Sequence, residues 1–296
     1  MVRLFLMVVV VLLCSSALHA QVESDTSLYR VETRDGNEYI GKIVSQDQRI
    51  LVLNTPQLGV ITIQKIDIKS MVQVRPDRVL DGRFLFNNPQ STRYLWQPNG
   101  YGLKRGEAYY QNIWIFFNQV SVGVTDNFTI GAGLIPLFLF AGASTPAWIS
   151  PKFSIPVTEN KFNIGAGALM GTVLGETESG FGLAYGTTTF GSRDKNFSVG
   201  LGYGYAAGEW ADTPLITFSG MIRTGERGYL LTENYLISSG DENLMLLSIG
   251  GRRIVKRVGI DFALILPTQT DGEVIAIPIL GLTVPFGQIS GTVSKK

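Results

Sequence analysis

From residue 106 to residue 287 the chain alternates bulky apolar side chains with small or polar ones. The clearest run places Phe197, Val199, Leu201, Tyr203 and Tyr205 at alternate positions, with serine or glycine between them. Successive side chains of a β-strand point to opposite faces, so this period of two predicts strands with one bulky apolar face and one small or polar face. A helix would need a period of 3.6, and no window of this region shows one.

The pattern divides this region into about twelve strands. Most of them have the ~9–11 residues that a tilted strand needs to cross a bilayer. The predicted strands are 106–116, 119–125, 128–136, 147–157, 161–173, 181–191, 196–206, 214–223, 228–238, 243–251, 257–266 and 273–286.

The connections between these strands alternate in length. Tight turns are predicted at 125–127, 158–160, 192–195, 224–227 and 252–256, longer links at 137–146, 174–180 and 207–213, and links of modest length at 239–242 and 267–272. Bacterial outer-membrane barrels have short periplasmic turns and longer outer loops. Residues 106–287 therefore predict an all-β fold, a roughly 12-stranded antiparallel up-and-down barrel of the transmembrane type with both ends on the periplasmic side.

The stretch between Asp126 and Lys152 carries no charge and is long enough for a membrane helix. However, prolines and glycines interrupt it, and Phe128, Ile130, Ala132 and Leu134 alternate with smaller residues. We therefore interpret it as a strand, an apolar outer loop at 137–143 and a second strand, with a helix as the alternative.

Residues 28–76 form a separate β-rich unit ahead of the barrel. Four or five short β-rich runs are separated by turn residues, with Asp35-Gly36 as a strong tight-turn signal. This spacing predicts a small SH3-like or Sm-like barrel, a structural or docking module that could contact a periplasmic protein. The segment 77–105 follows as a linker or plug. Its aromatic and arginine residues could fill or rim the barrel mouth, or pack between the two domains.

The first twenty residues have the features of a secretory signal. Arg3 precedes an uninterrupted apolar run over 4–13, and small residues lead to Ala20. The only cysteine (Cys14) and the only histidine (His19) both lie in this segment. The mature chain would therefore lack the side chains for serine–histidine triads, cysteine nucleophiles and histidine zinc sites. Residues 288–296 are interpreted as a tail.

Two runs resemble a known group of proteins. They extend from Thr92 through Gly100-Tyr-Gly-Leu-Lys-Arg-Gly-Glu-Ala-Tyr-Tyr-Gln-Asn112, and from Val120 to Gly133. They resemble uncharacterised exported β-barrel proteins of the Bacteroidota, and the likeness covers most of residues 90–286. This resemblance implies an outer-membrane barrel with a small N-terminal β-domain. It implies no established activity and no functional residues.

The candidate site residues are four charged residues of the predicted strands: Lys152, Arg223, Glu233 and Asp261. A lysine or arginine that faces lipid at mid-depth costs ~2–4 kcal/mol, so we expect Lys152, Arg223 and Asp261 to point into the barrel. Both faces of the strand that contains Glu233 carry apolar and polar residues, so the pattern does not show which way Glu233 points. Such interior charges would either line a narrow pore or fill it by pairing with one another. Trp114, Trp148, Trp210, Tyr109 and Tyr110 lie near strand ends and are candidates for aromatic girdles.

The sequence therefore predicts an integral outer-membrane barrel protein of structural or narrow passive channel type. We expect no catalytic residue, cofactor or metal site. The alternatives are a membrane enzyme that acts on lipid or lipopolysaccharide without histidine, and a soluble periplasmic β-protein. The expected partners are outer-membrane lipid and, during biogenesis, the barrel-assembly machinery. Balanced charge, with 25 Lys and Arg against 24 Asp and Glu, gives no indication of a nucleic-acid partner.

Overall fold

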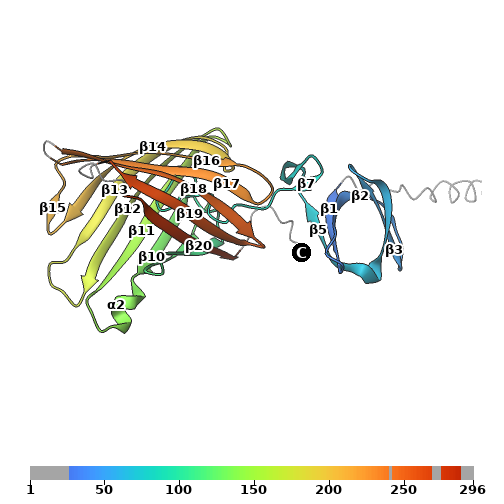
Figure 1. The fold of residues 1–296 in the computed structure, drawn as a ribbon, viewed down its shortest axis with the longest axis horizontal. Coiled ribbons are helices and arrows are strands. Elements are labelled where there is room, and N and C mark those ends of the chain that lie inside the picture. Colours follow the sequence, from blue (N-terminus) through green and yellow to red (C-terminus); the bar gives the residue numbers. More distant parts are fainter. Residues whose placement is uncertain (1–26, 240–241, 269–274, 288–296) are drawn as a thin grey trace, which may run out of the picture. The chain divides into compact units, whose positions relative to one another are not determined.

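The computed structural model describes residues 27–239, 242–268 and 275–287, which form two compact units that divide between Arg83 and Phe84 (Figure 1). The predicted signal segment at 1–20 and the tail at 288–296 lie outside the described residues. None of the helices in the described ranges is long and apolar enough to cross a membrane.

The N-terminal unit is a five-stranded antiparallel sheet in the order β4-β3-β2-β1-β5. Its strands are β1 (Leu28–Thr33), β2 (Glu38–Gln46), β3 (Ile50–Thr55), β4 (Gly59–Gln64) and β5 (Ile68–Val74), with a 3₁₀ turn at Lys65–Asp67. Asp47 closes the β2–β3 turn by accepting hydrogen bonds from the N–H groups of Ile50 and Arg49, which hold the pKa of its carboxyl below the ordinary value. The small core consists of Val31, Leu51, Leu53 and Ile63.

A short two-stranded hairpin follows this sheet. It pairs β6 (Val79–Leu80) with β7 (Arg83–Phe84) after a 3₁₀ turn at Pro76–Arg78. The turn residues Asp81 and Gly82 both have positive φ, at 51° and 72°. This conformation is typical of the Asp-Gly hairpin turns that match the twist of the two strands.

The second unit is a closed antiparallel barrel of twelve strands in which every strand pairs with its sequence neighbours. The strands are β8 (Glu107–Ile113), β9 (Phe117–Gly123), β10 (Phe128–Leu134), β11 (Thr145–Thr158), β12 (Phe162–Leu174), β13 (Phe181–Gly191), β14 (Lys195–Ala206), β16 (Leu215–Arg223), β17 (Gly228–Ser239), β18 (Glu242–Val255), β19 (Val258–Pro267) and β20 (Ile277–Gly287). The last strand, β20, pairs with β8 and closes the ring. The predicted all-β fold, with a 12-stranded up-and-down barrel and a small N-terminal β-domain, is confirmed.

The two ends of the barrel differ in their connections. Tight turns join the strands at the end where the chain enters β8 and leaves β20, and we call this the short-turn end. The opposite, long-loop end carries helix α2 (Pro136–Phe140) and the two-residue strand β15 (Glu209–Trp210), which extends β14. The uncharged stretch between Asp126 and Lys152 thus contributes to two strands joined by a loop with one helical turn.

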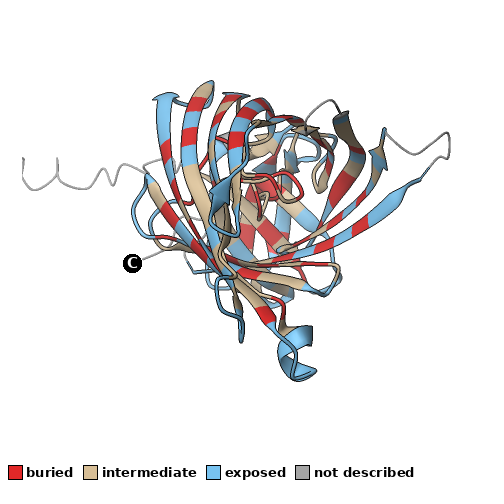
Figure 2. Ribbon diagram, turned by 90° about the vertical axis from the view of Figure 1, so that its left-hand side faces the viewer, coloured by how far each residue is buried: buried red, intermediate tan, exposed pale blue. Residues whose placement is uncertain are grey.

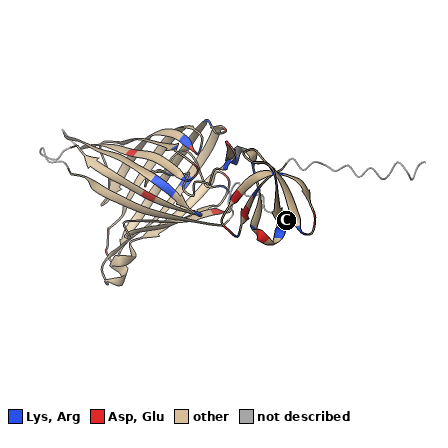
Figure 3. Ribbon diagram, turned by 45° about the vertical axis from the view of Figure 1, so that its right-hand side comes forward, with Lys and Arg blue, Asp and Glu red and all other residues tan. Residues whose placement is uncertain are grey.

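The barrel places most of its large apolar residues outside and mainly small or polar residues inside. Along β14, Phe197, Val199 and Leu201 are exposed, whereas Asn196 and Ser198 are buried. This alternation is the reverse of that in a water-soluble barrel, whose apolar side chains fill the interior. Figure 2 shows the buried and exposed positions alternating along the strands. Charged residues are sparse on the barrel strands in Figure 3.

Two of the five residues predicted for aromatic girdles point into the barrel instead. Trp148 and Tyr109 are 6% and 1% exposed. The indole N–H of Trp148 donates to Gln119 at 2.9 Å, and the Tyr109 hydroxyl accepts a hydrogen bond from Arg93 at 2.8 Å. The girdle prediction is wrong for both, because their interior polar partners were not apparent from position near a strand end. Trp210, by contrast, is 58% exposed.

Candidate functional site: a plug inside the barrel

Residues 84–105, hereafter the plug, run inside the barrel between the N-terminal hairpin and β8. Figure 2 shows this segment enclosed by the strands. It enters at the short-turn end, where the Phe86 N–H donates to the Glu226 carbonyl at 3.1 Å, and turns back at residues 94–97, where the Tyr94 N–H donates to the Gln97 carbonyl at 3.0 Å. It returns to the same end before β8. The plug therefore forms a loop inside the lumen that begins and ends at the short-turn end.

Glu233 on β17 holds the tip of the plug. One carboxylate oxygen, Oε2, accepts hydrogen bonds from three consecutive backbone N–H groups, those of Leu95, Trp96 and Gln97, at 2.8, 2.9 and 2.8 Å. The other oxygen accepts from the Tyr235 hydroxyl at 2.6 Å. Glu233 is 4% exposed, so water cannot replace these donors. Hydrogen bonds to a charged group contribute ~1.5–3 kcal/mol each, which makes this the strongest single contact of the tip.

A buried ion pair between neighbouring strands holds the first part of the plug. Arg252 on β18 lies directly opposite Asp261 on β19 and donates two hydrogen bonds to its carboxylate, at 2.5 and 2.9 Å. The remaining N–H groups of Arg252 donate to the Gln90 carbonyl at 2.9 Å and to the Tyr94 carbonyl. Arg252 thus spans from the wall to the plug with its guanidinium fully used.

Two further wall cations hold plug carbonyl groups. The Lys152 ammonium on β11 donates to the carbonyl oxygens of Tyr101 at 2.5 Å and Thr92 at 3.4 Å. Arg223 at the end of β16 donates to the Phe86 carbonyl at 2.8 Å and forms an ion pair with Asp194 at 3.0 Å. Both ends of the plug are therefore attached to the wall through charged side chains.

The plug also has apolar contacts with the barrel wall. Phe86, Tyr94 and Leu95 are buried in one cluster with inward-facing residues of the barrel wall, and Trp96 packs against it. The wall members are Ile113, Met221, Tyr229, Leu231, Ile254, Ala263 and Ile279. Burial of apolar surface adds to the polar anchors, since each fully buried large side chain contributes ~1.5–3 kcal/mol.

Inward-facing glycines give the plug its space. A Cβ atom at Gly165 on β12 would lie 3.3 Å from both the Asn99 carbonyl oxygen and the Gly100 Cα atom. A Cβ atom at Gly123 on β9 would lie 2.1 Å from the Lys104 carbonyl oxygen. Larger side chains at these two positions would therefore collide with the plug backbone.

The four residues predicted from the strand pattern do not form one network. Lys152, Glu233 and Asp261 are buried and face the lumen, and Arg223 is partly buried at the barrel rim. The expected pairing among them does not occur, because backbone groups of the plug supply the partners of Lys152 and Glu233. Asp261 pairs instead with Arg252, which the sequence analysis placed in a turn.

Two residues of the site were missed. Arg252 was assigned to a predicted turn at 252–256, whereas β18 continues to Val255 and the turn consists of Lys256 and Arg257. The period of two through Ser248 and Gly250 would have placed Arg252 inside. Arg93 was noted only as part of the plug segment, and no local pattern shows that its side chain lies between the plug and the wall.

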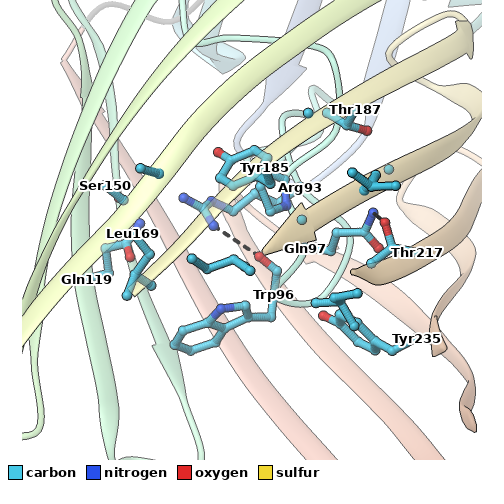
Figure 4. Close-up of a pocket in the computed structure, with 18 residues that line it drawn as sticks. Arg93, Trp96, Gln97, Gln119, Ser150, Leu169, Tyr185, Thr187, Thr217 and Tyr235 are labelled. Atoms are coloured by element: carbon cyan, nitrogen blue, oxygen red, sulfur yellow. Dashed lines mark hydrogen bonds between the residues drawn. The ribbon is translucent and has the colours of Figure 1, made fainter. Parts of the chain in front are cut away.

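A pocket lies between the plug and the wall on the side facing the long-loop end (Figure 4). The plug lines one side of it with Arg93, Trp96, Gln97 and Pro98. The wall contributes polar residues, among them Gln119, Ser150, Tyr185, Thr187, Thr217 and Tyr235, and the leucines 169, 183 and 215. The cavity has a volume of about 80 Å³.

No protein-family model and no curated protein sequence matches this chain. Among solved structures, the chain is similar to the KdgM porin in complex with disordered oligogalacturonate, with 7% identity and a TM-score of 0.43 over 61% of this chain and 97% of that one. It is also similar to a loop L8 deletion mutant of OmpT, an outer membrane protein of Vibrio cholerae (11% identity, TM-score 0.34, 88% and 96% covered). A third similar structure is the CymD monoaromatic hydrocarbon channel, with 8% identity and a TM-score of 0.34 over 88% of this chain and 86% of that one. These similarities concern the β-barrel fold alone.

Proposed function

We propose that this protein is an outer-membrane barrel whose lumen is closed by its own plug, a channel that conducts only when the plug moves. The carrying observation is the attachment of the plug across the lumen, with three successive backbone N–H groups on the Glu233 carboxylate. The contacts of Lys152, Arg223 and Arg252 with plug carbonyls extend the same arrangement.

The distribution of apolar residues supports a lipid environment. Exposed positions on the barrel include Phe153, Ile155, Phe197, Ile249 and Phe262, each at least half exposed. A soluble monomer rarely exposes contiguous apolar surface on this scale, so the alternative of a soluble periplasmic protein is disfavoured. The alternative of a lipid-acting enzyme receives no support from the two buried carboxylates, because Glu233 and Asp261 are occupied by the plug and by Arg252.

The connections support an orientation. With the short turns on the periplasmic side, as in other outer-membrane barrels, the plug and the chain leading to it start from the periplasm. The N-terminal unit would then be a periplasmic module, in a position to contact a periplasmic protein. A pull transmitted through the hairpin to Phe84 would act on the plug first.

The first prediction concerns substitutions on the lipid-facing surface of the barrel. We expect Ile249→Arg to lower the free energy of unfolding by ~2–4 kcal/mol, because Ile249 lies outward at the middle of β18 and an arginine would face lipid at mid-depth. Val255→Arg, on the same face of the same strand but at its end, should cost only ~0–1 kcal/mol. Urea unfolding from lipid vesicles measures both. Equal effects of the two substitutions would contradict membrane insertion.

A disulfide lock tests the plug itself. A Cβ atom at Gly102 would lie 3.0 Å from the Ser154 Cβ atom on β11, within a few tenths of the ~3.5–4.5 Å that a disulfide requires. Apart from Cys14, which falls in the predicted signal segment, the chain has no cysteine, so Gly102→Cys with Ser154→Cys adds the only pair. This disulfide would fix the plug to the wall without touching Glu233.

Moderate urea should free the plug before the barrel unfolds, because the plug beyond Phe84 has no strand ladder whereas the barrel ladder is closed. In planar bilayers with urea, we expect the unmodified protein to conduct and the oxidised double-cysteine variant to stay closed. Dithiothreitol should restore its current to that of the unmodified protein. A current that is the same in the oxidised and reduced variants would contradict a movable plug.

A further inference from the structure

Three polar groups of the pocket in Figure 4 lack a hydrogen-bond partner among the described residues. The Ser150 hydroxyl is buried and unpaired. Arg93 uses Nε for the Tyr109 hydroxyl and one terminal nitrogen for the Trp96 carbonyl, and its other terminal nitrogen, Nη2, makes no hydrogen bond in the part of the chain that is described. The Tyr185 hydroxyl also makes none within those ranges. In Figure 4 the Arg93 guanidinium extends from the plug toward Ser150, between Tyr185 and Trp96.

The other polar residues around these groups already have partners. Gln119 accepts from Trp148 at 2.9 Å and donates to Ser121 at 2.9 Å. Thr217 accepts from Gln97 at 2.6 Å, and Tyr235 donates to Glu233 at 2.6 Å. The unused hydrogen-bonding capacity of the pocket is therefore concentrated on Arg93, Ser150 and Tyr185, which can all donate.

Two cations, Arg93 and Lys152, lie at or near this pocket. Arg93 donates to a hydroxyl and a carbonyl oxygen, and Lys152 donates to two carbonyl oxygens, so neither cation donates a hydrogen bond to a carboxylate among the described residues. The nearby carboxylate of Glu233 is covered by three plug N–H groups and the Tyr235 hydroxyl. An anion in the pocket would thus meet an unpaired guanidinium edge and two hydroxyl donors.

We propose that this pocket binds a small monocarboxylate with a flat apolar body. The carboxylate would accept hydrogen bonds from Arg93 Nη2, Ser150 and Tyr185, and the body would lie against Trp96 and the leucines of the wall. A single guanidinium with two hydroxyls suits one negative charge, whereas a doubly charged phosphate would leave a charge uncompensated in a largely apolar site. The site lies on the face of the plug toward the long-loop end, and its occupation does not depend on whether the barrel conducts.

Benzoate and its neutral analogue benzamide provide the test, by isothermal titration calorimetry on the full-length protein in detergent micelles. We expect benzoate to bind with a 1:1 stoichiometry and benzamide to bind at least about tenfold more weakly, the ratio that corresponds to ~1.4 kcal/mol. Equal binding of the two compounds, or no benzoate heat in the millimolar range, would overturn the proposal. Tighter binding of inorganic phosphate than of benzoate would overturn the assignment to a carboxylate.

Matched serine variants locate the site. Ser150→Ala removes a hydroxyl that has no partner, so the fold should persist while benzoate affinity falls several-fold. Ser154→Ala removes an equally buried and unpaired hydroxyl on the same face of β11 that does not line the pocket, and it should leave the affinity unchanged. Arg93→Gln should reduce benzoate affinity at least about tenfold and abolish the preference over benzamide. Equal effects of Ser150→Ala and Ser154→Ala would contradict a site at this pocket.

Discussion

Replacing residues 85–104 by a glycine–serine linker of the same length should convert a closed barrel into an open one. Barrels of eight strands are filled by their own side chains and those of sixteen or more enclose an aqueous channel, so twelve strands without the plug should leave a narrow water-filled lumen. We expect single-channel conductance in planar bilayers to rise from baseline to a continuous open level, without urea. This is the largest functional change that we expect from any variant.

The control replaces the long-loop segment 137–143, which contains most of helix α2, by a linker of the same kind. This segment lies outside the lumen. Among the described residues it makes no hydrogen bond with the plug. Its replacement should leave the conductance at the level of the unmodified protein. If the plug-replaced barrel folds, as judged by its circular dichroism, and still carries no current, the lumen is closed by the wall and the proposed gating role of the plug is wrong.

Arg252→Met should produce the largest loss of stability. The substitution leaves Asp261 charged, 3% exposed and without its guanidinium partner, and it removes the hydrogen bonds to Gln90 and Tyr94 of the plug. Removing one partner of a buried ion pair costs ~3–5 kcal/mol. We expect the free energy of unfolding to decrease by this amount. Urea unfolding in detergent micelles, monitored by tryptophan fluorescence, measures it.

The double variant Arg252→Met with Asp261→Leu should regain much of this loss, because it leaves no isolated charge in the wall. Arg253→Met serves as the matched control, since Arg253 is the next residue of β18 and is exposed on the outer face. A change within ~0.5 kcal/mol is expected for it. A double variant no more stable than Arg252→Met alone would show that the plug contacts, and not the unpaired carboxylate, dominate the loss.

The strand pattern predicted which side chains of the barrel wall face the lumen wherever the strand boundaries were right. Lys152 follows from its alternation with Ile149 and Phe153, which are exposed on the outer face. Arg252 was missed because a turn was assigned four residues too early at the end of β18. Because of this error in the strand boundary, Arg252 was left out of the periodic pattern. The partner of Asp261 was therefore not predicted.

The partners of the charged residues were beyond the reach of the strand pattern. Glu233 and Lys152 bind backbone groups of Leu95 and Tyr101, more than fifty residues away. Backbone N–H and carbonyl groups are the same in every residue, so the sequence carries no signal of which of them meet a side chain. The same limit applies to the pocket, since Arg93 and Ser150 line it together only because the plug runs inside the barrel.

The sequence by itself determined the closed barrel, its twelve strands and the outward apolar face, because a period of two, strand length and turn residues are local properties of the chain. Only the tertiary structure decided that residues 84–105 lie in the lumen and how they are held. The segment 77–105 has no periodic pattern, and its place depends on a few long-range contacts with Glu233, Lys152 and Arg252. These contacts exist only once the twelve strands have closed around it.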